Sequence, residues 1–90
     1  MMKLKDAVAI AKGSLREFTP LPLSGVTGVV HIPDDDTWVV TIELIERVSI
    51  PDLFDILGSY EFVIDSEGDI IEYRRIGARK RNQMTVDIGG

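Results

Sequence analysis

The sequence contains no cysteine, and His31 is the single histidine among its 90 residues. The absence of cysteine excludes disulfide bonds, thiolate nucleophiles and thiolate-bound zinc or iron–sulfur sites. Any catalytic triad or histidine metal site would have to rely on His31 alone, which leaves mainly carboxylate chemistry. The sequence therefore predicts a protein that is not an enzyme and that needs no metal and no cofactor.

Long apolar runs and glycine-rich loops are also missing. No apolar stretch approaches the roughly 20 residues of a membrane helix, and no apolar segment follows a basic start as in a signal peptide. Gly25 and Gly28 stand without the third glycine or the lysine of a phosphate-binding loop. We therefore expect a cytoplasmic protein with no membrane association and no nucleotide site.

The composition that remains is that of one small globular domain. Hydrophobic residues make up 44% of the chain and charged residues 28%, and 90 residues leave room for a single core. We predict a single α+β domain over residues 1–81. The tail, residues 82–90, ends in two glycines and is expected to be loosely ordered.

Apolar spacing predicts the elements of this domain. Residues 3–18 repeat apolar side chains every three or four positions, which is typical of one helix face: Leu4, Val8, Ala11, Leu15 and Phe18. Two β-hairpins are expected, one from residues 26–32 and 37–47, the other from residues 60–65 and 70–76, with a short helix at 52–58 between them. We predict the N-terminal helix packed on a four-stranded, mainly antiparallel sheet, with the strand order left open.

Several polar groups have a simpler interpretation than a binding or catalytic site. Asp34, Asp35 and Asp36 lack the spaced ligands of a calcium loop and are expected to form a solvated turn. Glu43 and Glu46 lie three apart on a predicted strand, where side chains project to opposite faces, so they are excluded as an acid–base pair. His31 is expected to be exposed or paired.

Positive charge is concentrated near the C-terminus. Residues 1–73 hold five basic and fourteen acidic side chains and carry −9, whereas residues 74–90 hold five basic and one acidic and carry +4. The second hairpin also places Glu61 across from an arginine. As a candidate partner-binding site we take an aromatic residue and the basic cluster that follows it: Tyr73, Arg74, Arg75, Arg79, Lys80 and Arg81. A nucleic-acid-binding or regulatory module is the alternative, although the acidic body would repel phosphates.

The succession of short motifs resembles the gas vesicle protein O family across residues 4–81. A tryptophan-initiated strand with spaced glutamates is followed by an Ile-Pro pair, a Leu-x-x-Tyr-Glu segment, an Asp-x-x-Gly turn and Tyr-Arg-Arg. These motifs comprise Trp38, Val40, Glu43, Glu46, Ile50, Pro51, Asp55, Leu57, Tyr60, Glu61, Asp65, Gly68, Tyr73, Arg74 and Arg75.

The resemblance implies a non-enzymatic accessory role in gas vesicle synthesis, with a location in the cytoplasm at the vesicle. It implies other gas vesicle proteins as partners, including the shell subunit and an ATPase-like accessory protein, and it supplies no catalytic residues. Our own hypothesis is that the basic cluster docks on an acidic partner with Tyr73 as an anchor. The uncovered sheet face is expected to form a homodimer or to receive the shell subunit through Val39, Ile45, Val63 and Ile70.

Overall fold

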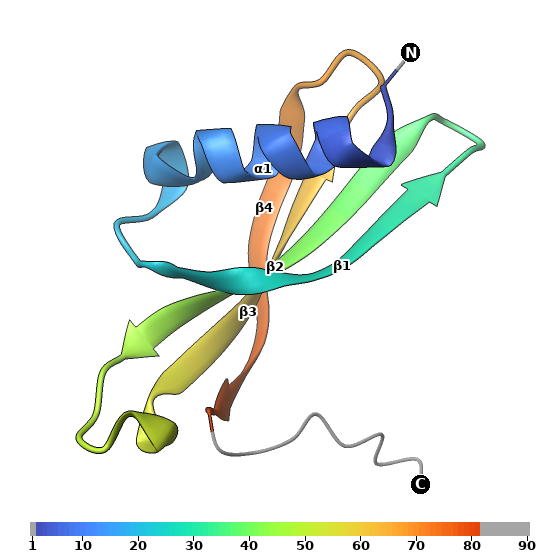
Figure 1. Cartoon of the computed structure of the whole chain (residues 1–90). Coiled ribbons are helices and arrows are strands. Elements are labelled where there is room, and N and C mark those ends of the chain that lie inside the picture. The colour runs from blue at the N-terminus through green and yellow to red at the C-terminus, as the bar shows by residue number, and fades with distance from the viewer. Residues whose placement is uncertain (1, 82–90) are drawn as a thin grey trace, which may run out of the picture.

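The computed structural model describes residues 2–81, which form one helix and one antiparallel sheet (Figure 1). Along the chain the elements are α1 (Leu4–Phe18), β1 (Leu23–Ile32), β2 (Thr37–Arg47), η1 (Asp52–Phe54), β3 (Ile56–Ile64) and β4 (Ile70–Lys80). The strands follow their sequence order across the sheet, β1-β2-β3-β4. The predicted α+β architecture is confirmed, and the tail predicted at 82–90 lies outside the described residues.

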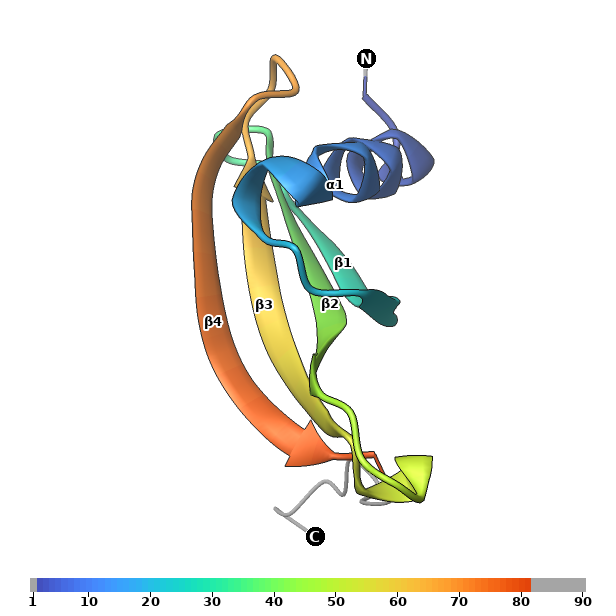
Figure 2. The ribbon, with the colours of Figure 1, turned by 90° about the vertical axis from the view of Figure 1, so that its left-hand side faces the viewer.

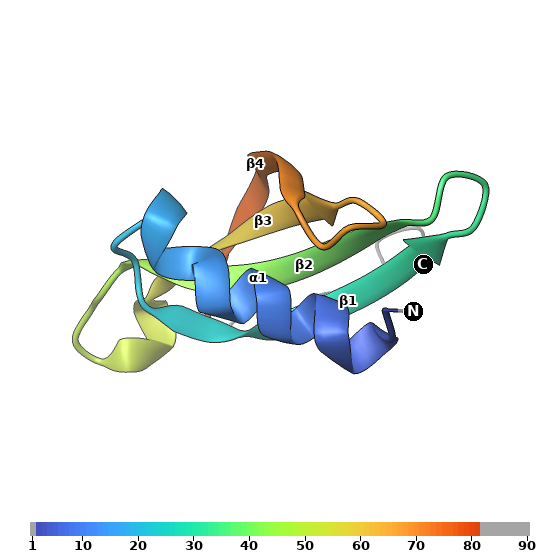
Figure 3. The ribbon, with the colours of Figure 1, turned by 90° about the horizontal axis from the view of Figure 1, so that it is seen from above.

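The helix α1 lies across one face of the sheet, above β1 and β2 (Figures 2 and 3). Its buried residues are Ala7, Ala11 and Leu15, and the two alanines let the helix backbone come close to the strands. At the ends of the predicted stripe, Leu4 is 55% exposed, whereas Phe18, although 40% exposed, packs edge-to-face on Phe62. A helix longer than the surface beneath it leaves its terminal turns partly uncovered.

The core fills the space between α1 and the sheet. Trp38, Val40, Ile42 and Leu44 of β2 are buried, as their alternation predicted. The side chains of β3 that share this face lie directly opposite them, and the buried set from that strand is Tyr60, Phe62 and Ile64. The face under α1 is therefore the interior of the protein, and Ile70, predicted on the uncovered face, packs against this core instead.

The second half of the chain differs from the prediction. A three-residue 3-10 turn, η1, replaces the short helix predicted at 52–58, and β3 already begins at Ile56. Leu57 is buried opposite Ile45, and Gly58 pairs with Leu44 instead of ending a helix. Strand pairing along the edge of a long hairpin outweighs the weak helical pattern of so short a segment.

The hairpin of β3 and β4 extends well beyond α1, so the sheet has a covered end and an uncovered end (Figure 2). At the covered end, the turn between these strands has Gly68 with a φ of +88°, and the Asp65 side chain accepts hydrogen bonds from the Glu67 and Asp69 backbone. At the uncovered end, β4 runs to Lys80, four residues past its predicted end, alongside η1. β1 likewise begins three residues earlier than predicted.

Candidate partner-binding surface

The six predicted site residues follow one another along β4 and its end, but they do not share a face. Tyr73 pairs with Phe62 and Arg75 with Tyr60, so both lie on the face covered by α1. Arg74 pairs with Glu61 on the opposite face. A register shift between Ser59 and Tyr60 changes the alternation beyond that point. The basic cluster is therefore divided between the two faces of an edge strand.

Four arginines of the basic cluster form ion pairs with carboxylates of the same chain. Arg74 Nη2 lies 3.0 Å from Glu61, as the hairpin predicted. The other pairs bridge longer sequence distances: Arg75 Nε to Glu46 at 2.8 Å, Arg79 Nε to Glu43 at 2.8 Å, and Arg81 Nη2 to Asp55 at 3.2 Å. We call these four contacts the arginine ladder. Its carboxylates offset much of the positive charge that the sequence concentrates here.

The pairs of the ladder differ in how far they are removed from water. The side chains of Glu43 and Asp55 are 9% and 5% exposed, whereas that of Arg74 is 61% exposed. Arg79 approaches Glu43 with two nitrogens, Nε and Nη2, in the bidentate geometry that strengthens such pairs. The hydrogen bonds from Arg79 to Glu43 raise the pKa of that guanidinium, so Arg79 keeps its charge at every ordinary pH.

Glu46 joins Arg75 to the hydroxyl of Tyr60. Glu46 continues the alternation of Ile42 and Leu44 and lies on the face of Tyr60, which donates a hydrogen bond to its carboxylate. The Arg75 hydrogen bonds lower the pKa of Glu46 below its usual 4.5, against the opposing effect of burial. Burial, together with Glu46, raises the pKa of Tyr60 to about 12. This carboxylate is therefore tied to two partners and is not available as a general base.

Tyr73 belongs to an aromatic cluster at the margin of the core. Its ring centroid lies 5.1 Å from that of Phe18, 4.9 Å from that of Phe62 and 5.6 Å from that of Tyr60. Burial raises the pKa of the Tyr73 hydroxyl. Packing of Tyr73 between the helix end and β3 fixes β4 on the sheet and leaves only part of the ring accessible.

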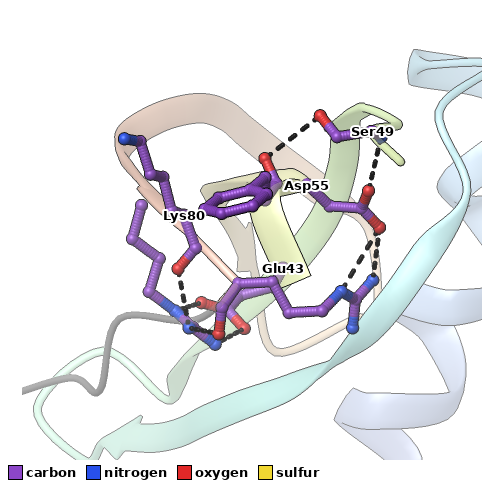
Figure 4. Close-up of polar contacts among 7 residues, drawn as sticks. Glu43, Ser49, Asp55 and Lys80 are labelled. Atoms are coloured by element: carbon purple, nitrogen blue, oxygen red, sulfur yellow. Dashed lines mark hydrogen bonds and ion pairs between the residues drawn. The ribbon is translucent and has the colours of Figure 1, made fainter. Parts of the chain in front are cut away.

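The segment between β2 and β3 is held by a buried carboxylate, as Figure 4 shows. Asp55 Oδ1 accepts a hydrogen bond from the backbone N–H of Ser49 at 2.6 Å. Asp55 Oδ2 accepts hydrogen bonds from Nε and Nη2 of Arg81. The Ser49 hydroxyl donates to the carbonyl of Phe54 at 3.2 Å, and the Arg81 N–H donates to the Asp55 carbonyl at 2.7 Å. The loop is thus fixed to the start of β3 and to the end of β4.

This fixed loop exposes apolar side chains to solvent. Ile50, which precedes Pro51 through a cis peptide bond, is 99% exposed. We name the exposed apolar residues of this loop the apolar tip: Val48, Ile50, Leu53 and Phe54. The helix predicted at 52–58 gave no indication of this surface. The available signal was a run of apolar residues interrupted by proline and aspartate between two strands.

The remaining polar candidates are paired locally. His31 Nε2 lies 2.7 Å from Asp36 Oδ1, and the imidazole stacks on Trp38 with 4.3 Å between ring centroids. Asp34, Asp35 and Asp36 lie in the turn between β1 and β2, with Asp36 at a φ of +53°. Over residues 2–81 no three histidine, aspartate or glutamate side chains are grouped as metal ligands. In the same residues no helix has the length and apolarity to cross a bilayer.

Comparison with known proteins identifies the family. The family model described as "Gas vesicle synthesis protein GvpO" matches residues 1–85. Gas vesicle protein O of Haloferax mediterranei is 28% identical over 85 residues, covering 94% of this chain and 60% of the relative. Gas vesicle protein O of Streptomyces sp. (strain CB03234) is 33% identical over 73 residues, covering 81% of this chain and 56% of the relative.

A third relative, gas vesicle protein O1 of Halobacterium salinarum, is 33% identical over 55 residues, covering 61% of this chain and 46% of the relative. The chain spans about half the length of the curated relatives it matches. No solved structure matches it. Because the family model covers nearly the whole sequence, the chain belongs to the GvpO family of gas vesicle synthesis proteins.

Proposed function

We propose that this chain serves gas vesicle synthesis as a non-enzymatic accessory protein that binds other gas vesicle proteins, in the cytoplasm and at the vesicle. Family membership supports the process, and the apolar tip carries the proposal of a binding role. Monomeric proteins rarely expose contiguous large apolar side chains without a partner to cover them. At the tip, four large apolar side chains of one loop, Val48, Ile50, Leu53 and Phe54, are exposed.

The way in which the tip is held also favours binding. Asp55, Ser49 and Arg81 fix the loop through five hydrogen bonds that do not involve the exposed apolar side chains. A loop that is already ordered loses less conformational entropy when it binds. The tip therefore suits a partner with an apolar surface, and the shell subunit and the ATPase-like accessory protein are the first candidates.

The experiment is a set of pairwise pull-downs between the purified chain and each of these two candidates. The double variant Ile50→Ser with Phe54→Ser removes apolar surface from the tip without touching Asp55 or Arg81. Ile76→Ser is the matched control, since Ile76 is also an exposed apolar residue but lies on β4. We expect the double variant to lose the interaction and the control to keep it. Equal capture of both variants contradicts the proposed role of the tip.

The basic cluster on β4 is a second proposed contact, and we restrict it to arginines whose side chains are mostly exposed. We infer that an acidic partner would meet Arg74 and Arg75, whose side chains are 61% and 53% exposed although each is already paired. Arg74→Gln is the cleaner test, because replacing Arg75 would also disturb Glu46 and Tyr60. Lys12→Gln on the exposed side of α1 is the control. Unchanged binding of Arg74→Gln at physiological salt removes this contact.

The nucleic-acid alternative has less support. A phosphate backbone would have to compete with the carboxylates of the arginine ladder, which are already in contact with four guanidinium groups. Lys80 and Arg79 also take part in contacts within the chain. A gel-shift assay at low salt tests the alternative, and a salt-dependent shift would support it.

A further inference from the structure

The two edges of the sheet differ in how they are protected. β4, at one edge, carries five charged residues among its eleven: Glu72, Arg74, Arg75, Arg79 and Lys80. β1, at the other edge, spans Leu23–Ile32 without a charged residue or a proline. Natural proteins usually block an exposed edge strand with charge, proline or a cover, because its free backbone groups can pair with another strand. Figure 3 shows β1 as the outermost strand, with no neighbour among the described residues.

The C-terminal half of β1 is regular enough to accept a further strand. Its two register shifts against β2 fall between Leu23 and Gly28, whereas the five pairs from Gly28 to Ile32 run without a break. Bulges that twist an edge away from a partner are therefore confined to the first half of the strand. In the regular half, Val30 and Ile32 are exposed β-branched side chains, which favour strand pairing.

The helix adds apolar surface on the same side. Ile10 faces the turn between β3 and β4, because its Cδ1 would lie 3.4 Å from a Cβ at Gly68. The first turns of α1 lie at the β1 side of the sheet (Figure 3). Leu4 is largely exposed there. A strand without charged side chains and several exposed apolar side chains thus lie along one edge of the molecule.

We propose that two copies of this chain associate through β1, antiparallel and about a twofold axis, so that their four-stranded sheets become one continuous sheet. A second copy fits this edge because an uncharged strand meets itself without like-charge contacts. The same self-pairing at β4 would bring arginines and lysine of two copies together. The inference stands independently of the apolar tip, which lies at the uncovered end of the sheet.

Sedimentation velocity over a range of concentrations tests this dimer, with two matched variants on opposite edges. Val30 on β1 and Ile71 on β4 are 57% and 59% exposed, so lysine at either position is accommodated in the monomer. We expect the unmodified chain to dimerise, Val30→Lys to raise the dissociation constant at least about tenfold, and Ile71→Lys to leave it unchanged. Amides of β1 should exchange with solvent more slowly as concentration rises.

Several results would overturn the inference. They are a wild-type chain that stays monomeric up to about 100 μM, a dimer that Val30→Lys leaves intact, or a dimer that Ile71→Lys disrupts. Larger assemblies that respond to both variants would show head-to-tail pairing of β1 with β4 and would equally contradict a closed dimer. Circular dichroism checks that each variant is folded. If Val30→Lys unfolds, Leu4→Glu in the exposed first turn of α1 takes its place, with the same weakening expected.

Discussion

At Gly58 the strand has no side chain, and the Glu46 carboxylate occupies the space that a Cβ would need. Gly58→Ala should displace Glu46 from Tyr60 and Arg75 and leave buried polar groups without partners, at a cost of about 1–3 kcal/mol in unfolding free energy. Gly77→Ala is the control, since a Cβ there meets nothing within 4 Å. Urea denaturation of both variants measures the difference, and equal stabilities would contradict the packing described for Glu46.

The lowered pKa of Glu46 makes part of the stability dependent on pH. A carboxyl whose pKa is lower in the folded state stabilises the fold above its unfolded value of 4.5, and this contribution is lost as pH falls through the folded pKa. Glu46→Gln should therefore be less stable than the wild type at pH 7, and the gap should narrow below pH 4.5. Thermal melts across this range measure the gap, and a gap independent of pH would be inconsistent with an ionised Glu46.

Tyr60 should make stability fall at alkaline pH, whereas Glu46 makes it fall at acidic pH. Its pKa is raised to about 12 from 10, so the unfolded chain loses the proton first and stability falls as pH rises above 10. Ultraviolet absorbance of tyrosinate should show its hydroxyl titrating well above 10 in the folded protein. Tyr60→Phe should remove the later of the two tyrosine titration steps and leave that of Tyr73, whose pKa is also raised by burial. A single step near 10 for both tyrosines would show that Tyr60 is not held as described.

Single residues also show where prediction from sequence reaches its limit. The contact of Glu61 with an arginine was predictable because the two strands are joined by a short turn, which fixes their register. The contact of Glu43 with Arg79 was not, since 36 residues separate them. Glu43 and Glu46 lie on opposite faces of β2, as their spacing predicted, but the contact of Glu46 with Arg75 was not predictable, since 29 residues separate the two.

At the scale of elements, the arginine ladder fastens β4 to the rest of the sheet at its uncovered end. Arg79→Gln leaves Glu43 nearly buried without its partner, which should cost on the order of 3 kcal/mol in unfolding free energy. Arg74→Gln breaks a pair whose arginine is exposed to water, so the loss in unfolding free energy should be much smaller. Double-mutant cycles with Glu43→Gln and Glu61→Gln isolate the two coupling energies. Similar values for both pairs would refute the structural distinction between them.

The helix and both hairpins were predictable because their apolar periodicity extends over many residues. The apolar face of β2 was read correctly from Trp38 to Leu44, and the turns were marked by aspartate, proline and glycine. The segment from Asp52 to Gly58 was not, since seven residues carry too little pattern to separate a helical turn from the start of a strand. Because of that error, the exposed apolar residues of the tip were not predicted.

At the scale of the whole molecule, α1 and the apolar tip lie at opposite ends of one twisted sheet (Figure 1). The helix closes the core at the covered end, while the ladder replaces a core at the other end with paired charges. The tip is therefore supported without being packed under the helix. This arrangement separates stability from the surface proposed for binding, so substitutions at the tip should leave the fold intact.

Vesicle formation in a cell that lacks its own copy of this gene tests the account most directly. The strain is complemented with the wild type, with the double variant Ile50→Ser and Phe54→Ser, or with the control Ile76→Ser. Immunoblotting shows equal protein levels, and light microscopy scores refractile vesicles. We predict vesicles with the wild type and the control and none with the double variant. Normal vesicles with a folded, fully expressed double variant would contradict a binding role for the apolar tip.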